Sequence, residues 1–469
     1  MIRIARPLFV CLAVLLITCT KAPETTDTTA TKAPAQTASA PTPQPELCAT
    51  SVSKCDGVNQ CAASPLTNQA ATIPTGRRCT PLGEGGGDGQ IFVDAFSWNL
   101  FLALNWPASV AGCAADPAKS ILDVRSGDGT YVVWQTYMPS DRVFVNPGYE
   151  KPAPWCSGNG LAEGERRVFD DEAKAVADVA EMGGPFLKIA EPGKDVLQAR
   201  GGVVTDQSKR WLRYERLMNQ TEYAYIADGK WNMPLLEAMQ KKGDGIAFPP
   251  DSIELKSAWK VLTADEASSG KYFTTRGVVC NTPEGERTPC DDQPVTMGLV
   301  GLHIVQQVNE GGPMFWATFE HRDNDTVFFN PKSTNPPNTN MAKTPYVELD
   351  EHCNGINEPT EIKRETPIPA DDKLNQYYHD LLGDSVFSNY ELVSTQWATG
   401  VANGGTPNDV ANITLETYVQ KLSVDIGHGA KATGCFACHL NAQTRVAGQN
   451  ANHSFLFREA KYATMPPKK

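Results

Sequence analysis

The sequence predicts an α+β fold, with helices plus an antiparallel β-rich middle and a short helical C-terminal segment. Three observations carry this prediction. A helical apolar pattern covers residues 91–106, strand-length runs follow one another closely from about residue 251, and helical patterns return from residue 371. Close succession favours antiparallel strands, because parallel strands need long crossover connections. We therefore expect an α+β body over residues 91–370 and a helical segment over residues 371–469.

The first helix follows from the spacing of its apolar residues. Phe92, Phe96 and Leu100 recur at helical intervals, and Pro107 ends the run, so a buried helix is expected here. Further elements are expected before residue 251. They are a strand over 129–138, helices over 171–183 and 212–226, and a short helix that ends at Gly243.

The middle of the chain has runs rich in β-branched and aromatic residues, bounded by Gly, Pro, Asn and Asp. These predicted strands cover residues 253–262, 271–280, 297–308, 313–321 and 326–331. Residues 330–370 are rich in Pro and Asn and predict a loop. Helical patterns are then expected over residues 373–382, 389–401 and 414–422.

The N-terminus has the pattern of a signal peptide over residues 1–19. Arg3 and Arg6 precede an apolar run over residues 8–17, which is too short to cross a bilayer as a helix. Residues 20–46 are dominated by Thr, Ala, Pro, Lys and Gln and predict a disordered tether, since this composition buries little. A buried N-terminal helix is the alternative, but it has little reason to precede such a tether. We therefore expect export.

The apolar run ends in "LITC", which resembles the lipobox of bacterial lipoproteins, with Cys19 as the lipidated residue. The resemblance implies a membrane anchor on Cys19, and a secreted protein cut near the same place is the alternative. The expected location is the periplasm or, through the anchor, a membrane of a bacterial envelope. The net charge of −12 argues against a nucleic-acid partner, because nucleic acids are bound by basic patches.

The cysteine count fits an oxidising compartment. Of 13 cysteines, two lie in the leader and two in a motif near the C-terminus, which leaves nine candidates for disulfides. Nine is an odd number, so at least one of them is free or bonded outside this set. Cys280 and Cys290 close a polar turn between two strand-like runs, and we predict a disulfide between them. Four cysteines crowd into a Cys-rich arm over residues 47–90, where disulfides are expected to hold the chain.

The C-terminal motif reads "GCFACH", in which His439 follows Cys435 and Cys438. A zinc site needs further ligands, and the sequence has no second CxxC or HxxxH pair. A thioredoxin-like dithiol lies at a strand-to-helix junction, whereas the motif here is expected to follow a helix with no strand before it. Two disulfide cysteines would leave the histidine unexplained. Haem attachment explains all three residues, because the two thiols add to the porphyrin vinyl groups and the histidine binds the iron.

This segment resembles c-type cytochromes, and the wider chain is similar to large bacterial single-haem cytochrome c proteins. The wider similarity rests on the motif and on residues 101–107, 297–308, 315–324 and 453–457. It implies one covalently bound haem c in a protein with a large non-haem body. Cys435 and Cys438 would form the thioethers and His439 would be the proximal iron ligand.

The sequence leaves the second iron ligand open. Met465 is the first candidate, because "MPP" resembles the surroundings of distal methionines in small cytochromes, and His303 is the second. An open sixth position is a further alternative. Arg445 lies close to the motif in sequence and is a candidate partner of a haem propionate, since a guanidinium matches carboxylate geometry. The remaining ligand candidates are Met297, His321, His428 and His453.

Three functions are compatible with a haem segment on a large body. The favoured one is single-electron transfer in the cell envelope, with a redox partner protein in the periplasm. A haem-dependent, peroxidase-like oxidoreductase is the alternative, because the body is larger than one haem requires. In the third, the body is a redox docking or binding module.

Overall fold

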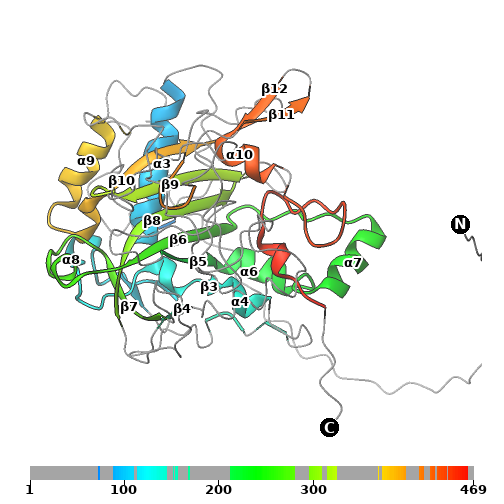
Figure 1. Cartoon of the computed structure of the whole chain (residues 1–469), viewed down its shortest axis with the longest axis horizontal. Coiled ribbons are helices and arrows are strands. Elements are labelled where there is room, and N and C mark those ends of the chain that lie inside the picture. The colour runs from blue at the N-terminus through cyan, green and yellow to red at the C-terminus, as the bar shows by residue number, and fades with distance from the viewer. Residues whose placement is uncertain are drawn as a thin grey trace, which may run out of the picture. The chain divides into compact units, whose positions relative to one another are not determined.

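In the computed structural model, residues Glu46–Lys469 form one compact unit. Its described part consists of helices and a large, mainly antiparallel sheet, which confirms the predicted α+β fold (Figure 1). Segments 1–19 and 20–46 and most of the Cys-rich arm lie outside the described residues. The structure describes residues 72–73, 88–109, 113–144, 151–152, 154–156, 167–169, 212–279, 295–308, 314–324, 368, 372–397, 411–416, 423–427, 430–440 and 442–462.

The main sheet has eight strands, and six of them run in the order β10-β9-β8-β6-β5-β3. Strand β7 pairs with β8 and β4, and only the β4–β7 pair is parallel among the described strands. Because β10 lies after residue 371, the C-terminal segment contributes to the sheet of the body. The strands are β3 (Met138–Pro139), β4 (Arg167–Phe169), β5 (Arg213–Met218), β6 (Ile253–Val261), β7 (Thr274–Val279), β8 (Val295–Gln307), β9 (Met314–His321) and β10 (Tyr390–Gln396).

Helices and two short hairpins complete the described elements. No described helix combines the length and apolar character needed to span a membrane. The α-helices are α3 (Asp88–Leu104), α4 (Ser140–Val143), α6 (Gln220–Ala227), α7 (Met233–Lys242), α8 (Ala264–Ser268), α9 (Lys373–Leu382) and α10 (Gly434–His439). The 3-10 helices are η1 (Ile121–Asp123), η2 (Val133–Thr136), η4 (Val386–Asn389) and η5 (Leu456–Glu459). The hairpins are β1 (Ala108–Ser109) with β2 (Ala114–Ala115) and β11 (Ser423–Gly427) with β12 (Ala430–Thr433).

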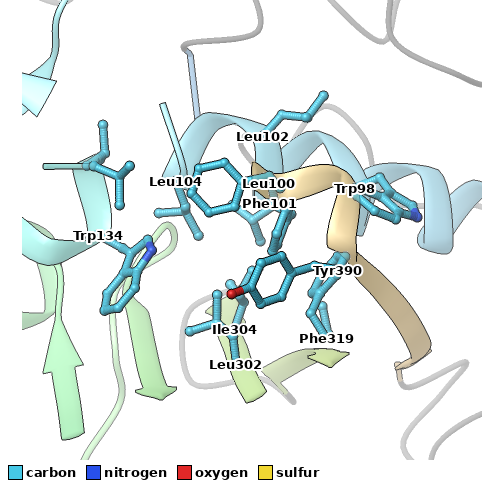
Figure 2. Packing of buried hydrophobic residues seen from close by; sticks show 14 of the residues in the cluster. Trp98, Leu100, Phe101, Leu102, Leu104, Trp134, Leu302, Ile304, Phe319 and Tyr390 are labelled. Carbon is cyan, nitrogen blue, oxygen red and sulfur yellow. The ribbon is translucent and has the colours of Figure 1, made fainter. Parts of the chain in front are cut away.

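One face of the sheet, here the apolar face, packs on α3 and carries the main core (Figure 2). Phe319 on β9 lies 4.3 Å from Phe101 between ring centroids, in a stacked arrangement, and meets Trp98 edge-on at 5.1 Å. All three side chains are fully buried. Such aromatic pairs contribute stabilisation beyond their buried area, so they fix α3 against the sheet.

The opposite face, here the polar face, carries charged residues in its middle. Cross-strand register brings Arg216, Lys256, His303 and Thr318 side by side on β5, β6, β8 and β9. Side chains alternate between faces along a strand, so these residues point away from the aromatic core. This face therefore needs polar partners from the chain that covers it.

Segment 411–416 covers one part of the polar face. The Asn412 amide donates to the Thr318 hydroxyl at 3.2 Å and to the Phe319 carbonyl at 2.8 Å. Gly301 on β8 permits this approach, because a Cβ there would lie only 2.1 Å from Thr414 Oγ1. The segment is thus held directly against the strands.

Residues 434–462, here the C-terminal cover, lie over another part of the polar face. The Ser454 hydroxyl donates to Glu254 at 2.7 Å, and Arg216 pairs with Glu459. Phe436, Leu456 and Phe457 of the cover are buried in a second apolar cluster with residues of α6 and α7. The cover and the sheet are therefore joined by both polar and apolar contacts.

Several predicted elements are confirmed. These are the helix over 91–106, found as α3, the helix over 373–382, found as α9, and the strands found as β6, β7, β8 and β9. The short helix before Gly243 is α7, and Gly243 caps it with φ 81°, a conformation that favours glycine. The predictions for residues 171–183 and 326–331 lie outside the described residues, as does most of 414–422.

Three predictions of secondary structure are wrong. The predicted strand over 129–138 is η2 followed by β3, because Trp134 packs on Trp259 and donates its indole N–H to Asn105 inside the core. The predicted helix over 212–226 is β5 followed by α6, and that over 389–401 contains β10. In both cases strand pairing in the large sheet overrides local helical propensity.

A disulfide joins Cys113 and Cys156, with 5.9 Å between their Cα atoms. These two cysteines are 43 residues apart, and no pattern in the sequence pairs them. The predicted Cys280–Cys290 pair and the lipidation candidate Cys19 lie outside the described residues.

Candidate functional site

Helix α10 carries the CxxCH motif and begins against the edge of the main sheet. Gly434 has φ 55°, and a Cβ there would lie 2.9 Å from the amide of Gln396 on β10. The Gln396 side-chain oxygen in turn accepts the N–H of Phe436 at 3.1 Å. A glycine before the first cysteine therefore allows α10 to start in contact with the sheet.

The motif residues share one face of α10. Cys438 and His439 follow Cys435 by three and four positions, and such residues are neighbours on a helix surface. Neither cysteine is in a disulfide. Burial, together with the negative charge of Glu416, raises the pKa of the Cys435 thiol well above its usual range. The arrangement presents two thiols and one imidazole in the same direction.

The expectation that no strand precedes the motif is wrong, because β12 ends at Thr433, directly before α10. The strand belongs to an antiparallel hairpin with β11 and not to a parallel βαβ unit. A redox dithiol also needs a depressed thiol pKa, whereas the pKa of Cys435 is raised. The motif thus follows a strand, as a redox dithiol does, but the raised pKa of its first thiol differs from that of a redox dithiol.

His439 is oriented by the chain that follows it. Its Nδ1 lies 2.6 Å from the carbonyl oxygen of His453, and a carbonyl can only accept, so Nδ1 carries the hydrogen. The neutral ring then has its lone pair on Nε2, the nitrogen that a metal would bind. Burial keeps the ring neutral by lowering the pKa of His439 to about 4. Asn452 and His453 both have positive φ, 49° and 68°, and this turn presents the carbonyl to the ring.

Aromatic side chains surround His439. Its ring centroid lies 4.9 Å from that of Phe455 and 5.6 Å from that of Trp316 on β9. Trp316 also contacts Phe436 edge-on at 4.8 Å. Apolar rings of this kind exclude water and lower the local dielectric, which strengthens electrostatic effects on any group held there.

The same surroundings contain buried polar atoms that lack a hydrogen-bond partner among the described residues. They include Trp316 Nε1, His453 Nδ1 and His303 Nδ1. Orphaned buried polar atoms are rare and call for an explanation. A bound group with carboxylates and a metal ion would satisfy such atoms. The residues present fit a haem, since two thiols, one open imidazole nitrogen and aromatic walls lie together.

Charged residues of the polar face also lie near the motif. His303 Nε2 lies 2.5 Å from a carboxylate oxygen of Glu416. Glu416 is buried, which raises its pKa, but the charges of His303 and Lys256 and its hydrogen bonds outweigh this and lower the pKa overall. Burial lowers the pKa of Lys256 to about 8, although Glu416 opposes the shift. Charges on Glu416 and Lys256 influence Cys435 and Cys438 respectively, so this group adjoins the motif.

The other predicted ligands fare differently. Met465 and His428 lie outside the described residues. Met297 is fully buried in the core of the apolar face. His321 uses both ring nitrogens in hydrogen bonds to backbone groups, so neither nitrogen is available to a metal. Arg445 is exposed, and its guanidinium donates to the Ala460 carbonyl at 3.4 Å, within the C-terminal cover.

Sequence reasoning missed three residues that shape the site. Trp316 and Lys256 stood in predicted strands and Glu416 in a predicted helix, and none of the three was assigned to the site. No spacing links them to the motif, because strand pairing and the approach of segment 411–416 bring them there. The stretch 453–457 did signal the site, since it supplies the carbonyl of His453 and the ring of Phe455.

Neither a family model, nor a curated protein, nor a solved structure matches this chain. The functional argument therefore rests on the residues described above.

Proposed function

We propose that this protein is an exported c-type cytochrome that carries one covalently bound haem c and transfers single electrons in the cell envelope. Cys435 and Cys438 would form the thioether links and His439 would bind the iron. The single observation that carries the proposal is the hydrogen bond from His439 Nδ1 to the His453 carbonyl, which leaves Nε2 open. Metal-binding histidines are commonly oriented by such a bond from the second nitrogen.

The bound haem would supply an iron that gains and loses one electron, and the protein's residues would tune it. The His453 carbonyl makes the His439 ring more basic by accepting its N–H, which favours the oxidised iron. Trp316 and Phe455 exclude water, which favours the oxidation state in which the haem centre has the lower net charge. The unpartnered Trp316 Nε1 and the exposed Arg445 are the candidates to hold the propionates.

Export and membrane attachment belong to the same proposal. Haem attachment of this kind is made outside the cytoplasm, and the leader over residues 1–19 would direct the chain there. A lipid on Cys19 would hold the protein at a membrane, and the tether over residues 20–46 would give it reach toward a redox partner protein in the periplasm. The resemblance to large bacterial single-haem cytochrome c proteins supports this reading.

A haem-dependent oxidoreductase is the second candidate. The observation in its favour is the His303–Glu416 pair beside the motif. A histidine oriented by a carboxylate is a common general acid–base catalyst. This function needs an iron with an open sixth position, whereas electron transfer is favoured by an iron with two protein ligands.

The test is to express the full chain in a bacterial host that attaches haem, and to measure mass and absorption. We expect a mass greater than the processed chain by one haem, and haem that stays on the chain under denaturing conditions. The double variant Cys435→Ser/Cys438→Ser should lack this haem. A low-spin spectrum that cyanide and carbon monoxide do not change supports electron transfer, and a high-spin spectrum that both ligands change supports the oxidoreductase.

The matched control removes the same number of thiols elsewhere. Cys113→Ser/Cys156→Ser deletes the disulfide and should lower stability by about 2–5 kcal/mol while covalent haem is kept. A colourless wild-type protein from a competent host, or covalent haem in the motif variant, would contradict the proposed function.

A further inference from the structure

His303 has one ring nitrogen engaged and one that is not. The residue lies on β8, and 8 % of its surface is exposed. Nε2 lies 2.5 Å from Glu416 Oε1, while Nδ1 is buried with no hydrogen-bond partner among the described residues. Since Glu416 accepts as a carboxylate, Nε2 carries the hydrogen, and the neutral form of the ring has its lone pair on Nδ1.

The chain holds this ring from several sides. Lys256 on β6 and Thr318 on β9 are its register partners. Glu416 is itself fixed, because its second carboxylate oxygen accepts the N–H of Asn412 at 2.9 Å. A buried nitrogen with an unshared lone pair and no partner costs free energy, yet the surroundings are arranged to keep it so. This points to a missing partner and not to a packing accident.

That open nitrogen lies close to the motif. His303 pairs in register with Thr318 on β9, and Trp316, two residues away on the same face of that strand, has its ring centroid 5.6 Å from that of His439. His453 also has an unpartnered nitrogen, but its backbone lies on the Nδ1 side of His439, away from the nitrogen that would face an iron.

We propose that His303 would be the second protein ligand of the haem iron, through Nδ1, with Glu416 holding the ring in place. The inference rests on the proposed function and deepens it, since it makes the iron a two-histidine centre. A carboxylate on the far nitrogen of a metal-bound histidine is a common orienting arrangement. It also makes the ring a stronger donor, which would favour the oxidised iron and lower the reduction potential.

Ligand substitution tests the assignment in the haem-loaded full chain. Near-infrared magnetic circular dichroism distinguishes two-nitrogen from nitrogen–sulfur ligation of ferric haem, and the wild type should show two nitrogens. His303→Ala should become high-spin and bind cyanide, and added imidazole should restore the low-spin spectrum. His303→Met should fold with a filled site and give the nitrogen–sulfur signature with a raised potential.

Two control variants leave His303 in place. Met465→Ala removes the other sequence candidate, and Lys256→Gln removes the neighbouring amine, which is also a conceivable ligand. Both should keep the wild-type signature. A His303→Ala protein with an unchanged two-nitrogen spectrum, or a Met465→Ala protein that alone becomes high-spin, would overturn the assignment. Covalent haem in all of these proteins would still support the proposed function even if His303 is not a ligand. Failure of the His303 assignment can therefore be distinguished from failure of the proposed function.

Glu416→Gln examines the positioning role. It keeps the size of the side chain but removes the charge, so the low-spin spectrum should persist while the reduction potential rises. Glu266→Gln is the matched control, because Glu266 also pairs with a cation but lies in the separate network of α8. Equal potentials in wild type and Glu416→Gln would show that Glu416 does not act on the iron through His303.

Discussion

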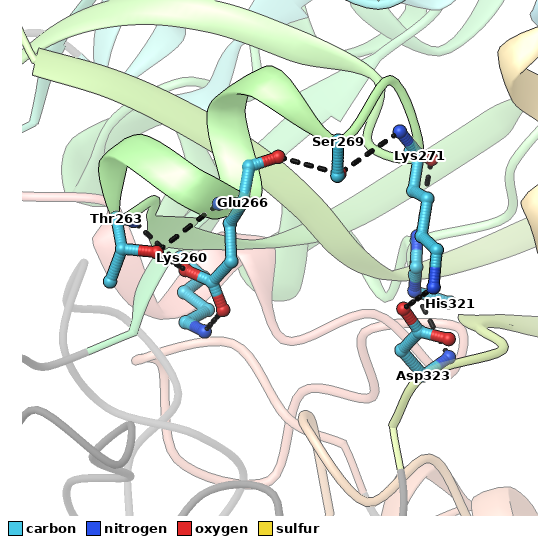
Figure 3. A network of polar contacts seen from close by, with 7 residues as sticks. All are labelled: Lys260, Thr263, Glu266, Ser269, Lys271, His321 and Asp323. Carbon is cyan, nitrogen blue, oxygen red and sulfur yellow. Dashed lines mark hydrogen bonds and ion pairs between the residues drawn. The ribbon is translucent and has the colours of Figure 1, made fainter.

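His303 and His321 lie on adjacent strands, β8 and β9, but on opposite faces of the same sheet. His321 stacks on Tyr272 at 4.1 Å between ring centroids. Its Nδ1 accepts the Asp323 N–H at 3.1 Å, and its Nε2 donates to the Lys271 carbonyl at 3.2 Å (Figure 3). His303 instead has a carboxylate on one nitrogen and no partner among the described residues on the other.

The difference shows how one residue type serves two purposes in one sheet. On the apolar face, both nitrogens of His321 are satisfied by backbone groups, and burial lowers its pKa to about 4, so it acts as a neutral packing residue. On the polar face, charged neighbours hold His303 with one lone pair available. The apolar face should therefore determine stability, and the polar face should determine the properties of the site.

The largest expected effect comes from the apolar face. Phe319→Ala removes a fully buried ring that contacts Trp98 and Phe101, and should lower the free energy of unfolding by about 3–5 kcal/mol. Urea unfolding followed by tryptophan fluorescence measures this loss. Phe319→Leu should lose less, because it refills part of the space. The haem spectrum of the folded Phe319→Ala protein should match that of the wild type. A changed spectrum would show that the apolar face also determines the properties of the site.

Much of the fold could be predicted from the sequence. The apolar periodicity of α3 and the strand-length runs of β6, β8 and β9 are strong local signals, and the structure confirms them. The failures at residues 212–218 and 390–396 have one cause. These strands gain their stability from pairing with β6 and β9, which are far away in sequence. The local residue pattern does not identify such partners.

The candidate site could be predicted only where its residues are contiguous in sequence. Cys435, Cys438 and His439 form a local motif, so their shared helix face follows from spacing alone. Glu416 and Lys256 reach the site through tertiary structure. The open nitrogen of His303 and the satisfied nitrogens of His321 could not be distinguished in sequence, because both histidines occupy strand-like apolar runs.

The next prediction uses the pH dependence of stability. The pKa of His321 is about 4 in the folded protein and about 6.5 when unfolded, so between these values only the unfolded chain binds the proton. Stability therefore falls as the pH falls through this window, by on the order of 2 kcal/mol between pH 6.5 and 5 from this residue. His321→Asn, which cannot titrate, should show a weaker fall in urea midpoints measured at pH 7 and pH 5.

His321→Asn keeps an acceptor for the Asp323 N–H but loses the bond to the Lys271 carbonyl, so it should be less stable at pH 7. The informative quantity is the difference between the two pH values and not the midpoint at either one. Lys271→Gln, an exposed change in the same network, should keep the wild-type difference. A His321→Asn protein with an undiminished difference would show that His321 is not held neutral by burial.

A further effect on stability, below that of Phe319→Ala, is expected on the polar face, at Gly301. In Gly301→Ala the new Cβ would lie 2.1 Å from Thr414 Oγ1, so segment 411–416 must move, at a cost of about 1–3 kcal/mol. This movement shifts Glu416 from His303, so the reduction potential of the haem-loaded protein should change despite the modest loss of stability. Gly298→Ala on the same strand is the control, because the atoms nearest its Cβ belong to the flexible side chain of Leu262, and it should leave the potential unchanged. If Gly301→Ala instead loses stability without any change in potential, segment 411–416 is only a structural cover, and the two faces of the sheet do not differ in role as argued above.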